Sequence, residues 1–401
     1  MANQPLGARP RHSRYDVVIV GGAAVGSAVA WFLSENPDFA GRVLVVERDP
    51  AYTYASTALS ASCIRHQYSN AINVRMSHFG TEFVRRFREI VGGDAPEITL
   101  HEFGYLFLAP EDKAYILRDN HAVQRECGAA TELLSRDEVQ ARFPFFQLED
   151  ISLASFNPVG EGWFDGYTMM QALRARAREN GVEYVTNEVV DIARDGNRVA
   201  TVRLVTGETI SCGATVNAAG PRAAEIARSA GLVIPVEARK RCLFVFDCQM
   251  PLGMTMPLTI DPSGIHCRSE GSYFLAGTVP KPDAAVAYDD FDVHYSEFED
   301  EIWPTLAYRV PQFEAIKLVN AWAGHYAYNV LDQNAIIGPH HEVANFIFAN
   351  GFSGHGLQQS PAVGRGVSEL ITYGEYRSLD LSELGYERVV SNTPFREQAI
   401  I

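Results

Sequence analysis

From Tyr15 to Glu47 the chain reads YDVVIVGGAAVGSAVAWFLSENPDFAGRVLVVE. The run DVVIV is apolar and β-branched, and it predicts a short, buried parallel strand. Glycines then interrupt the run, and SAVAWFL continues with helical character. A second apolar run, RVLVV, ends at Glu47. The order of strand, glycine turn, helix, strand and acid predicts the first half of a dinucleotide-binding βαβ unit.

The glycine turn predicts where a pyrophosphate group binds. Unpaired N–H groups and the positive dipole end of the helix attract an anion there, and glycines let the backbone approach it. When Gly21 and Gly26 are aligned with the outer glycines of G-x-G-x-x-G, Ala23 occupies the middle position, so we expect a longer or water-bridged contact. Glu47 closes the second strand, where a carboxylate takes the ribose hydroxyls of the adenosine half.

The composition narrows the class of protein. The chain has 401 residues, 47% of them hydrophobic, which is enough for two domains with sizeable cores. A net charge of −15 argues against a nucleic-acid partner. The six cysteines form no C-x-x-C pair, which favours free thiols in a reducing compartment. No apolar run approaches the roughly 20 residues of a membrane span. We expect a cytoplasmic protein without a membrane span, whose residues 1–14 form a short frayed arm.

Further elements follow from local patterns. Apolar spacing predicts one helix over 71–91, and charged helical sequence ends near Arg142. Asp165 is placed to cap a helix that Gly181 ends. Residues 143–164 are aromatic and turn-rich, so we expect them to line a cleft. Strands are expected at 101–110, in a meander turned by Asp195-Gly196-Asn197, at 214–219, in three stretches between 233 and 330, at 335–338 and at 345–349, with an irregular tail after Asp380.

Several motifs together resemble one family. They are DVVIVGGAAVGSA, Glu47, ATVNAAGPRA at 214–223, WAG at 322–324, LDQNAIIG at 331–338 and GFSGHGLQQSPAVGR at 351–365. In this combination the chain resembles the D-amino acid oxidase superfamily, in the branch that holds sarcosine oxidase, glycine oxidase and dimethylglycine dehydrogenase. The C-terminal third, down to the closing AII, resembles a mitochondrial group of FAD-dependent oxidoreductase-domain proteins implicated in respiratory complex I assembly.

The resemblance implies an α/β fold and bound FAD. We expect a Rossmann-like, glutathione-reductase-like FAD-binding domain and a second α+β substrate domain on a mixed sheet. The FAD-binding domain would comprise 14–98, 161–232 and 333–378, the substrate domain 99–160 and 233–332, and the tail 379–401.

Cofactor contacts are assigned from the glycine turn, a hydroxyl-rich run after Glu47 and the resemblance. The hydroxyls suit phosphate oxygens or a flavin edge, although an ordinary polar loop is the alternative. The segment from Ser353 to Leu357 leads into a helix whose N-terminus would stabilise negative charge on the reduced flavin pyrimidine. The assigned residues are Gly21, Gly22, Ala23, Ala24, Val25, Gly26, Glu47, Arg48, Ser56, Thr57, Ser62, Cys63, Val189, Ala219, Gly220, Gly324, Gly351, Phe352, Ser353, Gly354, His355, Gly356 and Leu357.

The resemblance also indicates substrate contacts. Arg65 matches the arginine that binds the substrate carboxylate in sarcosine oxidase, and its planar fork suits a carboxylate. The alternative is a surface arginine or a structural ion pair. Gln358 stands where the family has a second, lysine anchor. Tyr326 stands where glycine oxidase carries a carboxylate-binding arginine.

Two departures from the family pattern concern the flavin. The cysteine that links flavin covalently in monomeric sarcosine oxidase aligns with His325, so we expect non-covalent FAD. The lysine that activates O₂ aligns near Leu275. Lys240 is a substitute, since a cation near the flavin stabilises superoxide, or else a surface lysine.

A basic cluster is unusual in this acidic chain. It comprises Arg239, Lys240, Arg241, His266 and Arg268. Strand alternation would turn some of these residues to one face, where they could hold a second carboxylate. The alternative is a set of solvated charges paired with nearby acids.

These observations predict an FAD-dependent enzyme that oxidises the C–N bond of an N-substituted amino acid such as iminodiacetate or sarcosine. Hydride would pass to flavin N5, and the imine would hydrolyse to an oxo acid plus amine, with O₂ as acceptor giving H₂O₂. The catalytic residues would be Arg65, Tyr326, His325, Lys240 and Gln358, without a metal. The alternatives are a dehydrogenase that passes electrons to a carrier or quinone, and a scaffold that keeps FAD for stability. The oligomeric state is left open.

Overall fold

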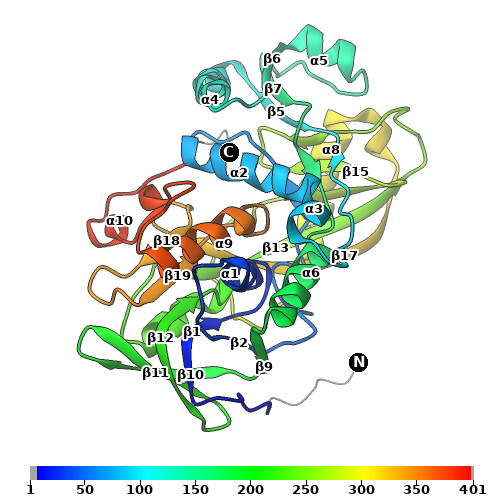
Figure 1. The fold of residues 1–401 in the computed structure, drawn as a ribbon. Helices are drawn as coiled ribbons and strands as arrows, with labels where there is room; N and C mark the ends of the chain where they lie inside the picture. Colours follow the sequence, from blue (N-terminus) through cyan, green and yellow to red (C-terminus); the bar gives the residue numbers. More distant parts are fainter. Residues whose placement is uncertain (1–6, 399–401) are drawn as a thin grey trace.

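The predicted βαβ unit is present in the computed structural model, which describes residues 7–398 (Figure 1). Strand β1 (Arg14–Val20) leads through the glycine turn into helix α1 (Ala24–Glu35) and strand β2 (Val43–Glu47). β1 and β2 are parallel, with Val17 opposite Val43. The expected α/β class is therefore confirmed.

The sheet around β1 has the strand order β10-β11-β12-β1-β2-β9, with β19 parallel to β12 and β18 antiparallel to β19. The predicted meander is confirmed, because β10, β11 and β12 pair in antiparallel succession. The remaining strands of this sheet are β9 (Glu183–Thr186), β10 (Val189–Asp195), β11 (Arg198–Leu204), β12 (Thr209–Asn217), β18 (Ile336–Pro339) and β19 (Phe346–Asn350).

Alternation along β1 builds a core on each side of this sheet. Val17 and Ile19 pack with α1, α6 (Gly166–Glu179) and α9 (Gly356–Tyr373), which lie together in Figure 1. Val18 and Val20 pack on the other side with α7 (Ala223–Ser229). Each such fully buried side chain contributes about 1.5–3 kcal/mol. Burial on both faces explains why the strand sequence is apolar throughout.

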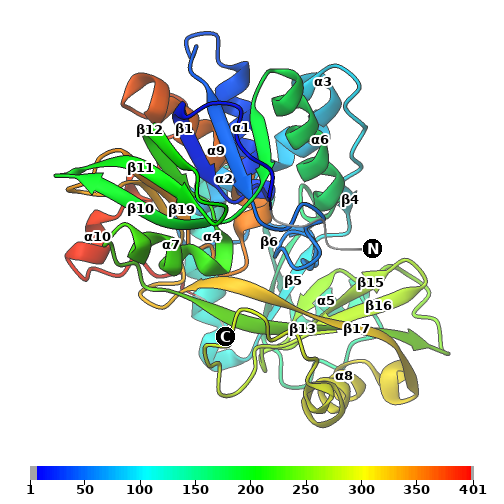
Figure 2. The same ribbon diagram turned by 90° about the horizontal axis from the view of Figure 1, so that it is seen from below.

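A second large sheet has the order β17-β13-β16-β15-β14-β5-β7-β6, and its two longest strands cross the lower half of Figure 2. It is mixed, as expected, because β14 and β5 are parallel. Its strands are β5 (Tyr105–Ala109), β6 (Glu132–Ser135), β7 (Leu153–Asn157), β13 (Val236–Cys248), β14 (Leu258–Ile260), β15 (His266–Glu270), β16 (Tyr273–Gly277) and β17 (Ile316–Asn329). The sheet around β1 takes all its strands from the predicted FAD-binding domain, and the second sheet takes all of its strands from the predicted substrate domain. The domain boundaries themselves stay a proposal.

The second sheet has two different faces. Its core face carries Phe244 and Phe246, which pack against a π-helical turn (Glu297–Ile302), α8 (Trp303–Arg309) and a 3₁₀ turn (Pro311–Glu314). Phe143, Phe145 and Phe146 belong to the same core. The expectation that this aromatic stretch lines a cleft is therefore wrong for these three rings, because a sheet with helices beneath it buries them.

The opposite face of the second sheet, here called the inner face, carries Arg241, Leu275, Arg268, Trp322 and Tyr326. Strand pairing places Leu275 beside Arg268 and Gly324 beside Arg241. The indole N–H of Trp322 donates to the Leu59 carbonyl oxygen at 3.0 Å, so this face meets the segment that follows β2. A small sheet, β3 (Cys63–Ile64), β8 (Gly162–Trp163) and β4 (His101–Glu102), fixes that segment. Of these two-residue strands the sequence indicated only β4, within the strand expected at 101–110.

Two predicted helices are divided. The helix expected over 71–91 is α2 (Ala71–Arg85) and α3 (Phe87–Val91), because Arg86 at φ −107° and ψ 22° breaks it. The charged stretch is a 3₁₀ turn (Glu111–Lys113), α4 (Ala114–Glu126) and α5 (Arg136–Arg142), separated by β6. Asp165 caps α6 as predicted, accepting the Thr168 N–H at 2.9 Å. No helix within residues 7–398 is long and apolar enough to cross a bilayer.

Residues 7–13 and 380–398 are more ordered than the sequence suggested. The Gly7 and Ala8 N–H groups donate to the Thr186 carbonyl, so residues 7–13 are not frayed. A 3₁₀ turn (Gly220–Arg222) precedes α7, and the tail contains a turn (Ser382–Leu384) and α10 (Glu387–Val390). Arg388 forms a buried ion pair with Asp332 at 2.7 Å, which corrects the expectation of an irregular tail. Residues 1–6 and the closing AII lie outside the described residues.

Candidate active site

The glycine turn forms a cradle at the N-terminus of α1. Ala23 is the N-cap and makes no side-chain capping bond, so the first-turn N–H groups after Ala24 remain available to an anion. A Cβ on Gly26 would lie 1.9 Å from the Gly21 oxygen, and a Cβ on Gly21 would lie 2.4 Å from the Ala218 oxygen. The Thr57 hydroxyl accepts the Ala24 N–H at 3.3 Å, which brings the hydroxyl-rich run to the same turn.

Glu47 lies beside this cradle. Its carboxylate accepts the Gly22 N–H at 2.7 Å and the Asp49 N–H at 2.8 Å. Burial raises the pKa of Glu47, and these N–H groups favour the ionised form. The Tyr52 hydroxyl is buried without a hydrogen-bond partner, 3.0 Å from where a Cβ on Gly22 would lie. The carboxylate, the orphaned hydroxyl and the open helix end fit the adenosine and pyrophosphate of FAD.

Other assigned cofactor residues fall around the same turn. Gly21 packs on Ala218 and Ala219, and a Cβ on Gly220 would meet nothing within 4 Å. Val189 is buried in the same core as Leu44 and Val46 of β2. Arg48 is exposed and lies 3.6 Å from Glu188. The Ser56 hydroxyl donates its one proton to the His325 carbonyl oxygen at 2.6 Å. It therefore does not donate to a phosphate oxygen, which corrects the role expected for Ser56.

The glycine segment 351–357 lies against the inner face. A Cβ on Gly354 would lie 2.5 Å from the Tyr326 ring. The Ser353 hydroxyl accepts the Asn329 N–H at 3.0 Å, which ties this segment to the end of β17. His355 is the N-cap of α9, and its side chain makes no capping bond. Phe352 and Leu357 are buried below it, and Gly356 approaches the Phe352 ring.

Arg65 lies between this segment and the inner face. Its guanidinium stacks over Tyr68 at 4.1 Å and over Phe107 at 5.5 Å. One amino group donates to the Gln67 carbonyl, and the other donates to His355 Nε2 at 3.1 Å. Because a guanidinium only donates, Nε2 must be the unprotonated nitrogen. Burial and then the charge of Arg65 lower the pKa of His355 to about 3, so its imidazole is neutral.

Arg65 differs from the arginines of the basic cluster in its charge balance. No Asp or Glu among the described residues forms an ion pair with it, and Arg65, Phe107, Tyr326 and His355 are only half-buried. Gln358 fixes the backbone of Arg65, because its side-chain oxygen accepts the Arg65 backbone N–H at 2.7 Å. Gln358 is therefore a positioning residue here. Cys63 and Ser62 precede Arg65, and Cys63 donates to the Ala61 carbonyl.

Lys240 and His325 lie away from this group. They are register partners on β13 and β17, and strand alternation turns both to the core face. Lys240 pairs with Asp290 at 2.6 Å, and His325 Nε2 lies 2.7 Å from the Asp290 carbonyl oxygen while its ring stacks on Phe291. The structure thus corrects both assignments: neither side chain lies with Arg65 and Tyr326, and Lys240 is not a surface residue.

The basic cluster divides in the same way. Arg239, Arg241, His266 and Arg268 share the inner face, as alternation predicted. The three arginines are paired with acids, and Arg241 and Arg268 are buried and not solvated, at 8% and 3% exposed. The ion pairs are Arg239–Glu237, Arg241–Asp283 and Arg268–Glu270.

Glu161 was not among the residues expected from the sequence. This fully buried carboxylate accepts the backbone N–H of Gln67 at 3.0 Å and its side-chain amide at 2.9 Å, and it also accepts the His66 N–H. Gln67 in turn accepts from Arg65, so Glu161 fixes the support of that guanidinium. Burial raises the pKa of Glu161 to about 7. Only its isolation in the turn-rich run NPVGEGWF could have drawn attention to it.

The pKa of Glu161 predicts a pH-dependent affinity at Arg65. Its pKa lies above the usual value, so Glu161 loses its proton as the pH rises through about 7. The new negative charge weakens anion binding at Arg65 by roughly tenfold. The dissociation constant of methylthioacetate, which carries a carboxylate but no amine, measures this effect between pH 6 and 8.

In Glu161→Gln we expect a flat profile. Glu369→Gln is the matched control, because Glu369 is a buried carboxylate that accepts the Arg377 and Ser378 N–H groups. A tenfold pH dependence that survives in Glu161→Gln contradicts the assignment.

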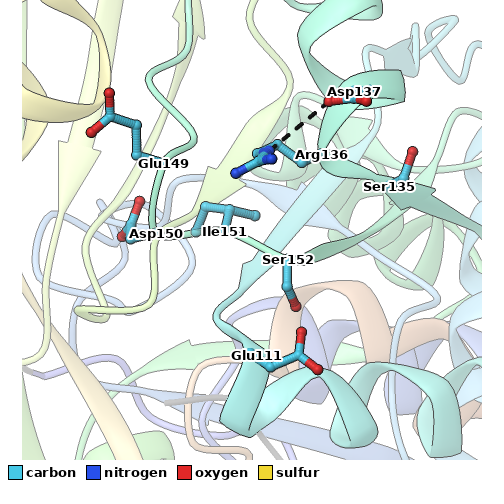
Figure 3. Close-up of a pocket in the computed structure, with 8 residues that line it drawn as sticks. All are labelled: Glu111, Ser135, Arg136, Asp137, Glu149, Asp150, Ile151 and Ser152. Carbon is cyan, nitrogen blue, oxygen red and sulfur yellow. Dashed lines mark ion pairs between the residues drawn. The ribbon is translucent and has the colours of Figure 1, made fainter.

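A surface hollow of about 440 Å³ lies elsewhere, between α5 and β7 (Figure 3). Glu111, Asp137, Glu149 and Asp150 line it, and Arg136 lies 4.0 Å from Asp137. Its acidic lining does not suit a carboxylate.

The cradle, Glu47 and the arginine above an aromatic face define a flavin-dependent oxidoreductase. The family model described as FAD dependent oxidoreductase (DAO) matches residues 16–370, and the chain belongs to this family. Its cofactor is FAD, as expected from the sequence.

The chain is similar to FAD-dependent oxidoreductase domain-containing protein 1 of Xenopus laevis, with 39% identity over 97% of this chain and 85% of that protein. It shares 24% identity with dimethylglycine dehydrogenase of Homo sapiens, over 96% of this chain and 45% of that protein. Among solved structures it resembles L-proline dehydrogenase from P. horikoshii, with a TM-score of 0.82 and 25% identity over 94% of this chain and 98% of that one.

Proposed function

We propose that this oxidoreductase acts on the CH–NH bond of an N-substituted amino acid, a secondary amine such as sarcosine or iminodiacetate. The observation that supports this proposal most is the position of Arg65. Its half-buried guanidinium has no acidic partner among the described residues and lies between an aromatic face and the glycine segment. Two of its N–H donors are engaged, which leaves three of five for a carboxylate. The names dimethylglycine dehydrogenase and monomeric sarcosine oxidase among its relatives support this class.

The residues of this chain bind and orient the substrate. Arg65 takes the carboxylate, and His355, neutral at physiological pH, keeps the guanidinium in its plane. Tyr326 offers a hydroxyl from the inner face. Phe107 and Tyr68 contact the guanidinium with their rings and so help to fix its position. The amine binds neutral or gives up its proton on binding.

FAD, when bound, accepts the hydride that leaves the substrate carbon. The amine nitrogen loses a proton at the same stage, and the resulting imine takes up water to give an oxo acid and an amine. We propose O₂ as the final acceptor, which takes two electrons and two protons to become H₂O₂.

We also propose a cytoplasmic location, which is based on the composition of the chain.

A dehydrogenase that passes its electrons to a carrier or quinone is the second candidate. Leu275, where the oxygen-activating lysine of the family was expected, is buried on the inner face. Lys240, the substitute, is on the core face with Asp290. With leucine at position 275 and Lys240 on the opposite face, neither position places a lysine on the inner face, which favours slow reaction with O₂.

The test is an anaerobic spectrum of the FAD-loaded protein mixed with sarcosine and then with iminodiacetate. We expect loss of the flavin absorbance at about 450 nm. Methylthioacetate is the control, because its sulfur cannot form an imine and so must not bleach the flavin. Readmitted air restores the colour within seconds in an oxidase, and slowly in a dehydrogenase.

If neither amine bleaches the flavin, bulkier N-substituted amino acids come next. Failure of these too refutes the proposal and leaves the assembly or scaffold protein, in which FAD serves stability.

A further inference from the structure

The inner face holds a second cationic position beside the proposed substrate site. Arg241 lies with its guanidinium carbon 4.9 Å from the centre of the Tyr326 ring, and Tyr326 packs on Gly354. Arg241 is therefore one ring away from the glycine segment that contacts Arg65. Its side chain is 9% exposed, in surroundings where an unbalanced charge has a large effect.

Asp283 occupies this position. Its two carboxylate oxygens accept from the two amino groups of Arg241, each at 2.8 Å. One oxygen lies 3.6 Å from Arg239, whose other partner is Glu237 at 2.8 Å. Two guanidinium groups thus face two carboxylates, and the group has no net charge.

Asp283 comes from an irregular segment and not from the sheet. Residues 278–296 connect β16 to the π-helical turn, with a single bridge between Ala285 and Arg239. The same segment provides Asp290, which pairs with Lys240 on the core face. The segment is therefore clamped to β13 through one acid on each face of the strand.

We propose that Asp283 makes the site selective for substrates that carry a single carboxylate. This inference rests on the proposed function and deepens it. Asp283 fills the place of a second substrate carboxylate, so the site binds a monocarboxylic secondary amine such as sarcosine at Arg65 more tightly than a dicarboxylic one such as iminodiacetate. Without the charge of Asp283, Arg241 becomes a free bidentate donor for that second carboxylate.

The test uses a pair of thioethers that bind without reacting. Methylthioacetate carries one carboxylate and thiodiacetate carries two, and perturbation of the flavin spectrum of the FAD-loaded protein gives both dissociation constants. The wild type binds methylthioacetate more tightly. In Asp283→Asn the preference moves toward thiodiacetate by roughly 10- to 100-fold, the effect of charge-assisted hydrogen bonds to a free guanidinium.

Asp150→Asn is the matched control. Asp150 holds Arg309 with the same bidentate distances of 2.8 Å, on the other side of the sheet. We expect this variant to keep the wild-type preference. Asp283→Ser, which removes the charge and retains an oxygen, serves if Asp283→Asn does not fold.

The outcomes separate this inference from the proposed function. A wild type that binds thiodiacetate more tightly, or a folded Asp283→Asn with an unchanged preference, overturns the role of Asp283 even if sarcosine bleaches the flavin. A shifted preference together with no amine that bleaches the flavin keeps the role of Asp283 in anion binding and refutes the reaction.

Discussion

Replacing Arg65 with methionine lowers kcat/KM for the amino-acid substrate by roughly 10²- to 10³-fold and leaves the flavin content unchanged. Methionine keeps the apolar stem over Tyr68 and Phe107 but removes the donors for the carboxylate. Most of the loss falls on KM, because a carboxylate is bound in both the ground state and the transition state. Part falls on kcat, because a misplaced carbon reacts more slowly.

Steady-state kinetics with sarcosine measures this prediction. Arg142→Met is the matched control: Arg142 stacks over Phe156 at 4.4 Å, near the surface of the second sheet. Arg65→Lys recovers part of KM, because a lysine keeps the charge without the planar fork. A folded, yellow Arg65→Met protein with unchanged kcat/KM removes Arg65 from the site.

Replacing Gly26 with alanine gives a protein that does not retain FAD. The new methyl carbon would lie 1.9 Å from the Gly21 oxygen, a backbone atom that cannot move without opening the turn. The strain costs about 1–3 kcal/mol or more. The displaced turn also disturbs the N–H groups at the start of α1, so the stabilisation by bound FAD is lost as well.

The ratio of flavin to protein after gel filtration, with melting temperatures with and without added FAD, measures this effect. Gly374→Ala is the control, since Gly374 has open space around it, and its φ of +78° adds a backbone strain that does not involve the cradle. This control retains its flavin. Full flavin content in Gly26→Ala refutes the cradle as described.

Local patterns explain what could be predicted from the sequence. The βαβ unit, the meander and the Asp165 cap depend on neighbouring residues, whose spacing is visible in the chain. The inner face followed from alternation in β13 and β15. Arg65 came from the resemblance, because no spacing distinguishes it from other arginines.

Long-range pairs explain what could not be predicted. Asp283 and Asp290 come from a segment without periodicity, and their partners are 42 and 50 residues away in sequence. Glu161 bonds with Gln67 across 94 residues. His325 was assigned to the site by alignment and Lys240 by its charge, whereas a one-residue step along a strand reverses the face.

The C-terminal segment has a consequence for the order in which this protein is made. Glu397 accepts the Ser69 N–H, 328 residues earlier in the chain, and so caps the start of α2 next to Tyr68 and the arginine loop. A ribosome adds residues from the N-terminus onward and encloses the newest ones in its exit tunnel. Because 328 residues separate Ser69 from Glu397, the loop that carries Arg65 is synthesised well before the residue that supports it at α2, and this support forms only once Glu397 has left the tunnel.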